Sequence, residues 1–71
     1  MDEDVCVLFG EKLRSIRLEL GYSQEELSFK TGLHRTYISS VERGKRNISL
    51  ANIKKLADAL GIKMKDLMPE L

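Results

Sequence analysis

The sequence contains few of the residues that many classes of protein need, and each shortage excludes a class. Its 71 residues include one cysteine and one histidine. Cys6 has no partner for an internal disulfide, which favours a reducing, cytoplasmic compartment. One histidine and one cysteine provide neither a catalytic constellation nor a set of metal ligands, so we expect no enzyme and no cofactor.

Long apolar runs, strand patterns and internal prolines are also missing. No run approaches the roughly 18 apolar residues of a transmembrane helix, and the acidic start MDEDV argues against a secretory signal, so we expect no membrane partner. No stretch alternates apolar and polar residues as a strand does, and the only proline is Pro69. We therefore predict an all-α fold of five helices, in a single domain over residues 1–71.

Three segments begin in the same way, with a capping residue that has an apolar residue before it and another soon after it. The capping residues are Ser23, His34 and Ser49. Glu26 completes a capping box with Ser23, and a ring nitrogen of His34 is expected to accept a backbone N–H. These signals predict helices at about 24–31, 35–43 and 50–60.

Apolar spacing predicts the other two helices and much of the core. Residues four, four, three and four positions apart give a first helix whose buried face contains Val5, Phe9, Leu13, Ile16 and Leu20. The helix at 50–60 is predicted to bury Leu50, Ile53, Leu56, Ala57 and Leu60. A short last helix is predicted at about 63–69.

Residues 24–43 combine two short helices with a tight turn, and they carry the main functional signal. Gly32 permits the positive φ that the turn needs, and Ser28 is small enough for the helices to approach closely. With the apolar residues facing inward, the second helix turns short polar and basic groups outward. These groups are Arg35, Thr36, Ser39 and Ser40. They can contact base edges in a major groove, so we predict a helix-turn-helix that reads DNA.

Residues 9–62 resemble the phage Cro and repressor type of helix-turn-helix domain, which is also called XRE-like. The resemblance rests on SQEEL, TGLHRTYIS, ERGKRNIS and LADALGI. More narrowly, LHRTYISSVERGKRNIS is similar to the controller proteins of bacterial restriction-modification systems. Ser28 departs from the usual pattern, which has alanine there. The resemblance implies a compact five-helix, lambda-repressor-like domain, with its core at about 9–62, that binds DNA as a homodimer.

The resemblance also assigns roles to particular residues. It places Gln24 against a DNA phosphate at a helix start, and it makes Arg17 and Glu42 a structural ion pair. Tyr37 is assigned to the DNA backbone, with a base contact or a structural role as alternatives. The loop after the second helix is expected to grip the backbone through Arg43, Lys45, Arg46 and Asn47. This basic cluster matters more than the net charge of +1, although a merely solvated charged face is the alternative.

The chain has more apolar residues after residue 61 than a small five-helix core requires. We predict that the last helix, at about 63–69, lies in a dimer interface. The predicted interface residues are Ile62, Met64, Leu67 and Met68, with Leu71 in the same surplus. The alternative is that these residues simply close the core.

The predicted function is sequence-specific transcription regulation by a bacterial homodimer on a palindromic operator, most specifically as a restriction-modification controller. The expected partners are double-stranded DNA and a second copy of the chain, with RNA polymerase as a further candidate. Two other hypotheses stay open at this point. One is a helix-turn-helix module that docks proteins rather than DNA, and the other is an antitoxin that regulates its own operon.

Overall fold

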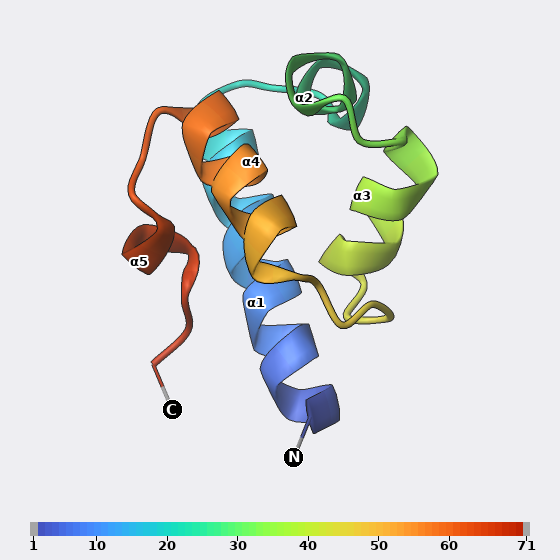
Figure 1. Cartoon of the computed structure of the whole chain (residues 1–71), viewed down its shortest axis with the longest axis vertical. Helices are drawn as coiled ribbons and strands as arrows, with labels where there is room; N and C mark the ends of the chain where they lie inside the picture. Colours follow the sequence, from blue (N-terminus) through green and yellow to red (C-terminus); the bar gives the residue numbers. More distant parts are fainter. Residues whose placement is uncertain (1, 71) are drawn as a thin grey trace.

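The computed structural model describes residues 2–70, and all of the regular structure in that range is helical (Figure 1). The helices are α1 (Asp2–Glu19), α2 (Gln24–Thr31), α3 (Arg35–Glu42), α4 (Leu50–Leu60) and α5 (Met64–Leu67). The predicted all-α, five-helix fold is confirmed, and the bounds of α2 and α4 agree with the predicted ranges. In residues 2–70, no helix combines the length and the apolarity that crossing a bilayer requires.

The short helices pack around the long helix α1 and around one another. α3 contacts both α1 and α2, α4 contacts α2 and α5, and α5 also reaches α1. In Figure 1, α3 and α5 lie on opposite sides of α4, and the two chain ends point toward the same end of the molecule. A surface on α3 and a surface on α5 are therefore presented in different directions.

Every helix contributes at least one fully buried apolar side chain to a common core. The largest of these are Leu13, Leu27, Ile38, Val41, Leu56 and Leu67. Burying such a side chain is worth roughly 1.5–3 kcal/mol, so this cluster is the main source of stability in a small chain. The core fixes α2 and α3 against each other and thereby sets the geometry of the turn between them.

Two of the three predicted caps are present, and the third is wrong. The Ser23 hydroxyl accepts the Glu26 N–H at 3.0 Å, and the Glu26 carboxylate accepts the Ser23 N–H at 2.9 Å. The Ser49 hydroxyl accepts the Asn52 N–H at 3.2 Å. The His34 side chain makes no capping hydrogen bond. Its ring is exposed, so water can satisfy the first N–H groups of α3.

The predicted buried faces of the first helix and of the helix at 50–60 are confirmed at most positions, but three predicted core residues are exposed. Leu50 is 71% exposed at the first residue of α4, and Leu20 is 48% exposed just beyond α1. Val5 is 37% exposed in the first turns of α1. Apolar spacing assigns a residue to a face, but a helix end that extends past its packing partners stays in water.

Gly10 is the point of closest approach between α1 and the end of α3. It is buried, and an added Cβ would lie 2.7 Å from the Glu42 carbonyl oxygen and closer still to that of Val41. Real side chains do not approach backbone oxygens so closely. The absence of a side chain at residue 10 therefore sets how near α3 comes to α1.

We expect Gly10→Ala to lower the free energy of unfolding by about 1–3 kcal/mol, because the added methyl group overpacks the α1–α3 contact. Alanine is the better helix former by about 1 kcal/mol, so helix propensity alone predicts the opposite sign. Urea denaturation measures the change. Ser15→Ala, at an exposed position of α1, is the control and should change stability by less than about 0.5 kcal/mol. A stabilised Gly10→Ala protein would contradict the close approach.

Candidate nucleic-acid interface

The turn between α2 and α3 is held by a left-handed glycine and by two hydroxyls of α2. Gly32 has φ 77°, and its N–H donates to the Ser28 carbonyl at 2.8 Å. The Ser28 hydroxyl donates to the Leu33 carbonyl, and the Thr31 hydroxyl accepts the Leu33 N–H at 3.1 Å. The small size of Ser28 was predicted to let the two helices approach closely. Its hydroxyl also connects α2 to the turn. An alanine at residue 28 lacks this hydrogen bond.

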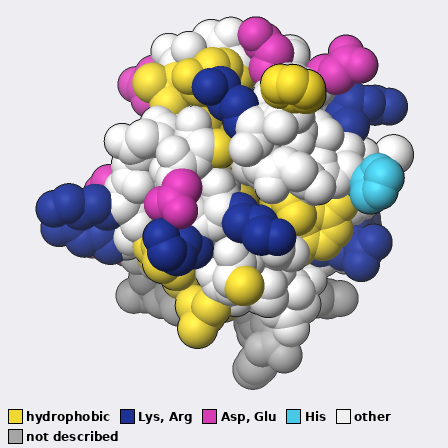
Figure 2. Space-filling view, turned by 45° about the horizontal axis from the view of Figure 1, so that its top comes forward, with side chains coloured by type: hydrophobic (Ala, Val, Ile, Leu, Met, Phe, Trp, Pro, Cys, Tyr) yellow, Lys and Arg dark blue, Asp and Glu magenta, His cyan; other side chains and the backbone are white. Residues whose placement is uncertain are grey.

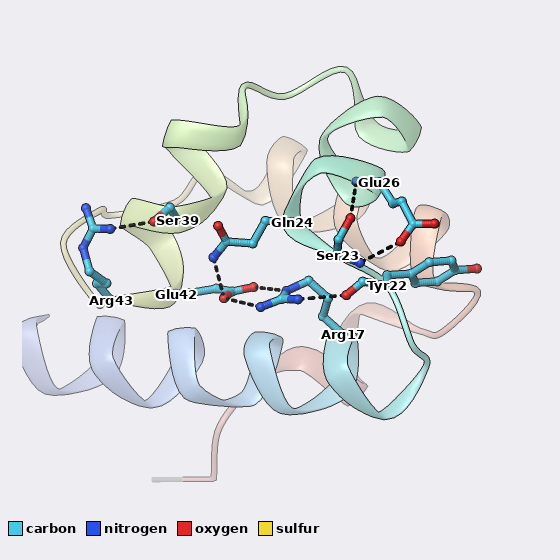
Figure 3. A network of polar contacts seen from close by, with 8 residues as sticks. All are labelled: Arg17, Tyr22, Ser23, Gln24, Glu26, Ser39, Glu42 and Arg43. Carbon is cyan, nitrogen blue, oxygen red and sulfur yellow. Dashed lines mark hydrogen bonds and ion pairs between the residues drawn. The ribbon is translucent and has the colours of Figure 1, made fainter.

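The outer side of α3 presents the predicted polar groups, while its inner side is buried. Arg35 and Thr36 are exposed, and Ser39 and Ser40 are half-buried. The Ser39 hydroxyl accepts a hydrogen bond from Arg43, so the guanidinium folds back along the outer side of α3 (Figure 3). Arg43 therefore lies beside the predicted base-reading groups rather than out in the loop.

Arg17 and Glu42 form the predicted ion pair, and the pair is bidentate and buried. Arg17 Nε lies 2.6 Å from one carboxylate oxygen and Nη2 lies 3.0 Å from the other. Arg17 Nη1 also donates to the Tyr22 carbonyl at 2.8 Å, which joins α1 to the segment before α2 (Figure 3). The hydrogen bond to Glu42 raises the pKa of Arg17, and burial opposes that shift. The pair therefore joins α1 to the end of α3 and to the segment before α2.

Gln24 joins this network, which the sequence did not indicate. Its side-chain Nε2 donates to the Glu42 carboxylate at 3.0 Å (Figure 3). One of its two amide hydrogens is used in this way, and the other is free for a DNA phosphate. No sequence signal connects residues 24 and 42, because the contact depends on how α2 packs against α3. Gln24 as a phosphate contact remains a prediction.

The loop after α3 is positively charged, and it contains no acidic residue. The predicted phosphate-binding residues of this loop are all exposed: Arg43, Lys45, Arg46 and Asn47. Glu42 precedes them in sequence, but its charge is buried against Arg17. Figure 2 shows that basic and acidic side chains are both present on the face that includes the α2 end of the molecule, with apolar patches between them. The local charge is thus more favourable for phosphate binding than the sequence suggests.

Tyr37 is half-buried and has two partners from the chain that follows α3. The Asn52 amide donates to its hydroxyl at 3.0 Å, and the Arg46 guanidinium lies 5.2 Å from the ring centroid. Asn52 belongs to the first turn of α4 and was not among the predicted site residues. Its side-chain type alone gives no signal, because an exposed asparagine near a helix start is common.

The predicted dimer interface needs one correction. Leu67 is fully buried in the core of its own chain, so it has no surface to offer a second copy. The α5 helix ends too close to the core for Leu67 to point outward. Ile62 and Met64 are half-buried, and Met68 is 41% exposed. Leu71 lies outside the described residues.

The two packed helices and the outward polar face of α3 define a helix-turn-helix protein of the DNA-binding class. The sequence pattern of the helix-turn-helix family matches residues 13–67. The chain belongs to this family, and it is a DNA-binding transcription regulator.

Similar proteins agree with this assignment over most of their length. Control protein C.BamHI from Bacillus amyloliquefaciens is 54% identical over 69 residues, which cover 96% of this chain and 85% of that protein. Control protein C.MunI from Mycoplasma sp is 42% identical over 69 residues, which cover 96% and 93%. The crystal structure of the restriction-modification controller protein C.AhdI from Aeromonas hydrophila superimposes with a TM-score of 0.87 at 52% identity, covering 89% of this chain and 96% of that one.

Glu42→Gln should lower the free energy of unfolding by about 3–5 kcal/mol, because it leaves the Arg17 guanidinium buried without a counter-charge. Asp58→Asn is the matched control. It removes the acid of an exposed pair, Lys54–Asp58, whose side chains are each 66% exposed, and it should cost no more than about 1 kcal/mol. Thermal and urea unfolding measure both changes. Equal costs for the two variants would show that the Arg17–Glu42 pair gains nothing from burial.

Proposed function

We propose that the protein acts as a homodimer on a palindromic operator and regulates the operon of a restriction-modification system. The observation that carries this proposal is the outward face of α3, which presents Arg35 and Thr36 to solvent beside an uncancelled basic loop. Such a face has little use in a packed interior. It matches the groups that read a major groove, since a guanidinium can bond guanine O6 and N7 together and a threonine methyl can contact thymine.

The proposed contacts divide into two kinds. Arg35, Thr36, Ser39 and Ser40 read bases from α3. Gln24 and the loop residues hold phosphates and carry no sequence information. Because phosphate contacts release counter-ions, the affinity should fall steeply as salt rises.

A dimer follows from the small reach of one α3 helix. A single recognition helix covers only a few base pairs, and dimers gain specificity by reading two half-sites about one helical turn apart. The proposed interface residues Ile62, Met64 and Met68 belong to α5 and the positions beside it. The helix α5 lies on the opposite side of α4 from α3 (Figure 1). A second copy docked there leaves both recognition helices free. In a bacterium such a regulator acts in the cytoplasm, and RNA polymerase is a candidate partner at the promoter.

The restriction-modification context is supported by the relatives rather than by the site. C.AhdI is a restriction-modification controller protein, and this chain is 52% identical to it. An antitoxin would present the same surfaces, so the neighbouring genes decide between the two contexts. A gene for a restriction endonuclease or its methyltransferase beside this one supports the proposal, and a toxin gene contradicts it.

Arg35→Ala tests the proposed reading of bases. A duplex selected by the wild-type protein from a random pool serves as the operator. We expect the variant to fold normally and to lose about 1–3 kcal/mol of discrimination at one or two guanines, because the bidentate contact is gone. Mobility shifts with single-base operator variants measure this loss.

Arg14→Ala is the matched control for this experiment. It removes the same side chain from an exposed position of α1 and should leave the base preference unchanged. Unaltered discrimination in Arg35→Ala would refute the role of Arg35. Failure of the wild-type protein to select any duplex at low salt would instead favour a module that docks proteins.

Met68→Asp tests the position of the dimer interface. A carboxylate buried between two copies is costly, so we expect a monomer that binds the selected operator at least about tenfold more weakly. Sedimentation velocity gives the oligomeric state. Phe29→Asp is the control, since Phe29 is 92% exposed on α2 and lies outside the proposed interface. A monomeric Phe29→Asp protein together with a dimeric Met68→Asp protein would move the interface to α2.

A further inference from the structure

Asn52 connects two parts of the proposed DNA surface that come from different segments of the chain. It lies in the first turn of α4, where its backbone N–H donates to the Ser49 hydroxyl at 3.2 Å. Its side-chain amide donates to the Tyr37 hydroxyl of α3 at 3.0 Å. The cap fixes the backbone of Asn52, and its side chain then fixes the end of the Tyr37 ring.

The direction of this hydrogen bond determines what the Tyr37 hydroxyl can do. A phenol oxygen can accept one hydrogen bond and donate another. Because the oxygen accepts from Asn52, its own hydrogen must point elsewhere. Tyr37 is half-buried, and it lines an open hollow of about 390 Å³ together with residues of the turn, α3, the loop and α4. The free hydrogen is therefore available to an acceptor that enters this hollow.

Arg46 brings a positive charge to the same place. Its guanidinium lies 5.2 Å from the Tyr37 ring centroid, within the range of a cation–π contact. This contact holds an exposed, flexible loop side chain against α3. Besides Tyr37, Arg46 and Asn52, the polar residues that line the hollow are His34, Thr36 and Ser40. No acidic residue lines it, and several of the lining side chains carry donors, so the hollow suits an anion.

We propose that Asn52 is a positioning residue for DNA binding. It holds the Tyr37 hydroxyl as a donor and, through the ring, keeps Arg46 beside it, so that the two groups clamp one phosphate of the DNA backbone. Asn52 itself touches no DNA in this arrangement. The inference rests on the proposed DNA-binding function, and it adds the residue that prepares the phosphate contact before DNA arrives.

Asn52→Asp is the sharpest test, because the side chain keeps its size but accepts a hydrogen bond where the amide donated one. The carboxylate accepts the Tyr37 O–H and turns that hydrogen away from the hollow, and its charge pairs with Arg46. An acidic residue in the first turn of a helix is favourable, so the melting temperature should be unchanged or higher. On a selected duplex of about 20 base pairs, we expect affinity to fall about tenfold or more. The slope of log K against log salt should shrink by about one for each protomer.

Two further variants separate positioning from general stability. Asn52→Ala should weaken binding by about two- to tenfold, as should Tyr37→Phe. In the Tyr37→Phe background, Asn52→Ala should have no further effect on binding, because both changes disable the same hydroxyl. Lys55→Gln is the matched charge control. It removes one positive charge from an exposed residue of α4 outside this hollow and should leave the affinity within about twofold.

The possible outcomes are distinguishable. Normal affinity and an unchanged salt slope in Asn52→Asp would overturn the inference while wild-type binding upholds the proposed function. An Asn52→Ala effect that persists in the Tyr37→Phe background would also overturn it, because Asn52 then acts without the hydroxyl. No duplex binding by the wild-type protein would overturn the proposed function and the inference together.

Discussion

The buried pair of Arg17 and Glu42 holds the DNA-reading half of the molecule in place. Its atoms join α1, the segment before α2, and the end of α3, with separations of 2.6–3.0 Å. Within the described residues no buried side-chain polar atom lacks a hydrogen-bond partner, so the charges are fully compensated. Gly10 adds to this constraint, because its missing side chain lets α3 approach α1 closely. The direction in which α3 presents its outer side follows from these contacts.

The residues that hold the helices together differ from the residues that are proposed to contact bases. Apolar residues and the ion pair fix α2 and α3, whereas Arg35 and Thr36 keep their side chains in water. Two residues proposed to contact phosphates are held by contacts within the protein: Gln24 by Glu42, and Tyr37 by Asn52. Groups held in place before binding lose less conformational entropy when DNA arrives, which favours affinity without adding contacts.

Most features that depend on a few consecutive residues were predicted correctly from the sequence, whereas several features that depend on how distant segments pack were not. The capping box of Ser23 and the left-handed turn at Gly32 were predicted correctly, because both depend on a few consecutive residues. The outward position of Thr36 was predicted because a helical period places it nearly opposite the buried Ile38 and Val41. The predictions for Leu50 and Leu67 failed in opposite directions. Periodicity indicates which residues share a face, but it does not indicate where a neighbouring helix ends.

The sequence by itself determined the helices, the turn and the polar outer side of α3, since propensity, capping and periodicity act within a few residues of chain. Only the tertiary structure decided that Gln24 joins the ion pair of Arg17 and Glu42, and that the Asn52 amide donates to the Tyr37 hydroxyl. These contacts connect residues that are 18 and 15 positions apart. Hydrogen bonds require separations near 3 Å, and only the packing of whole helices sets distances between such segments to that precision.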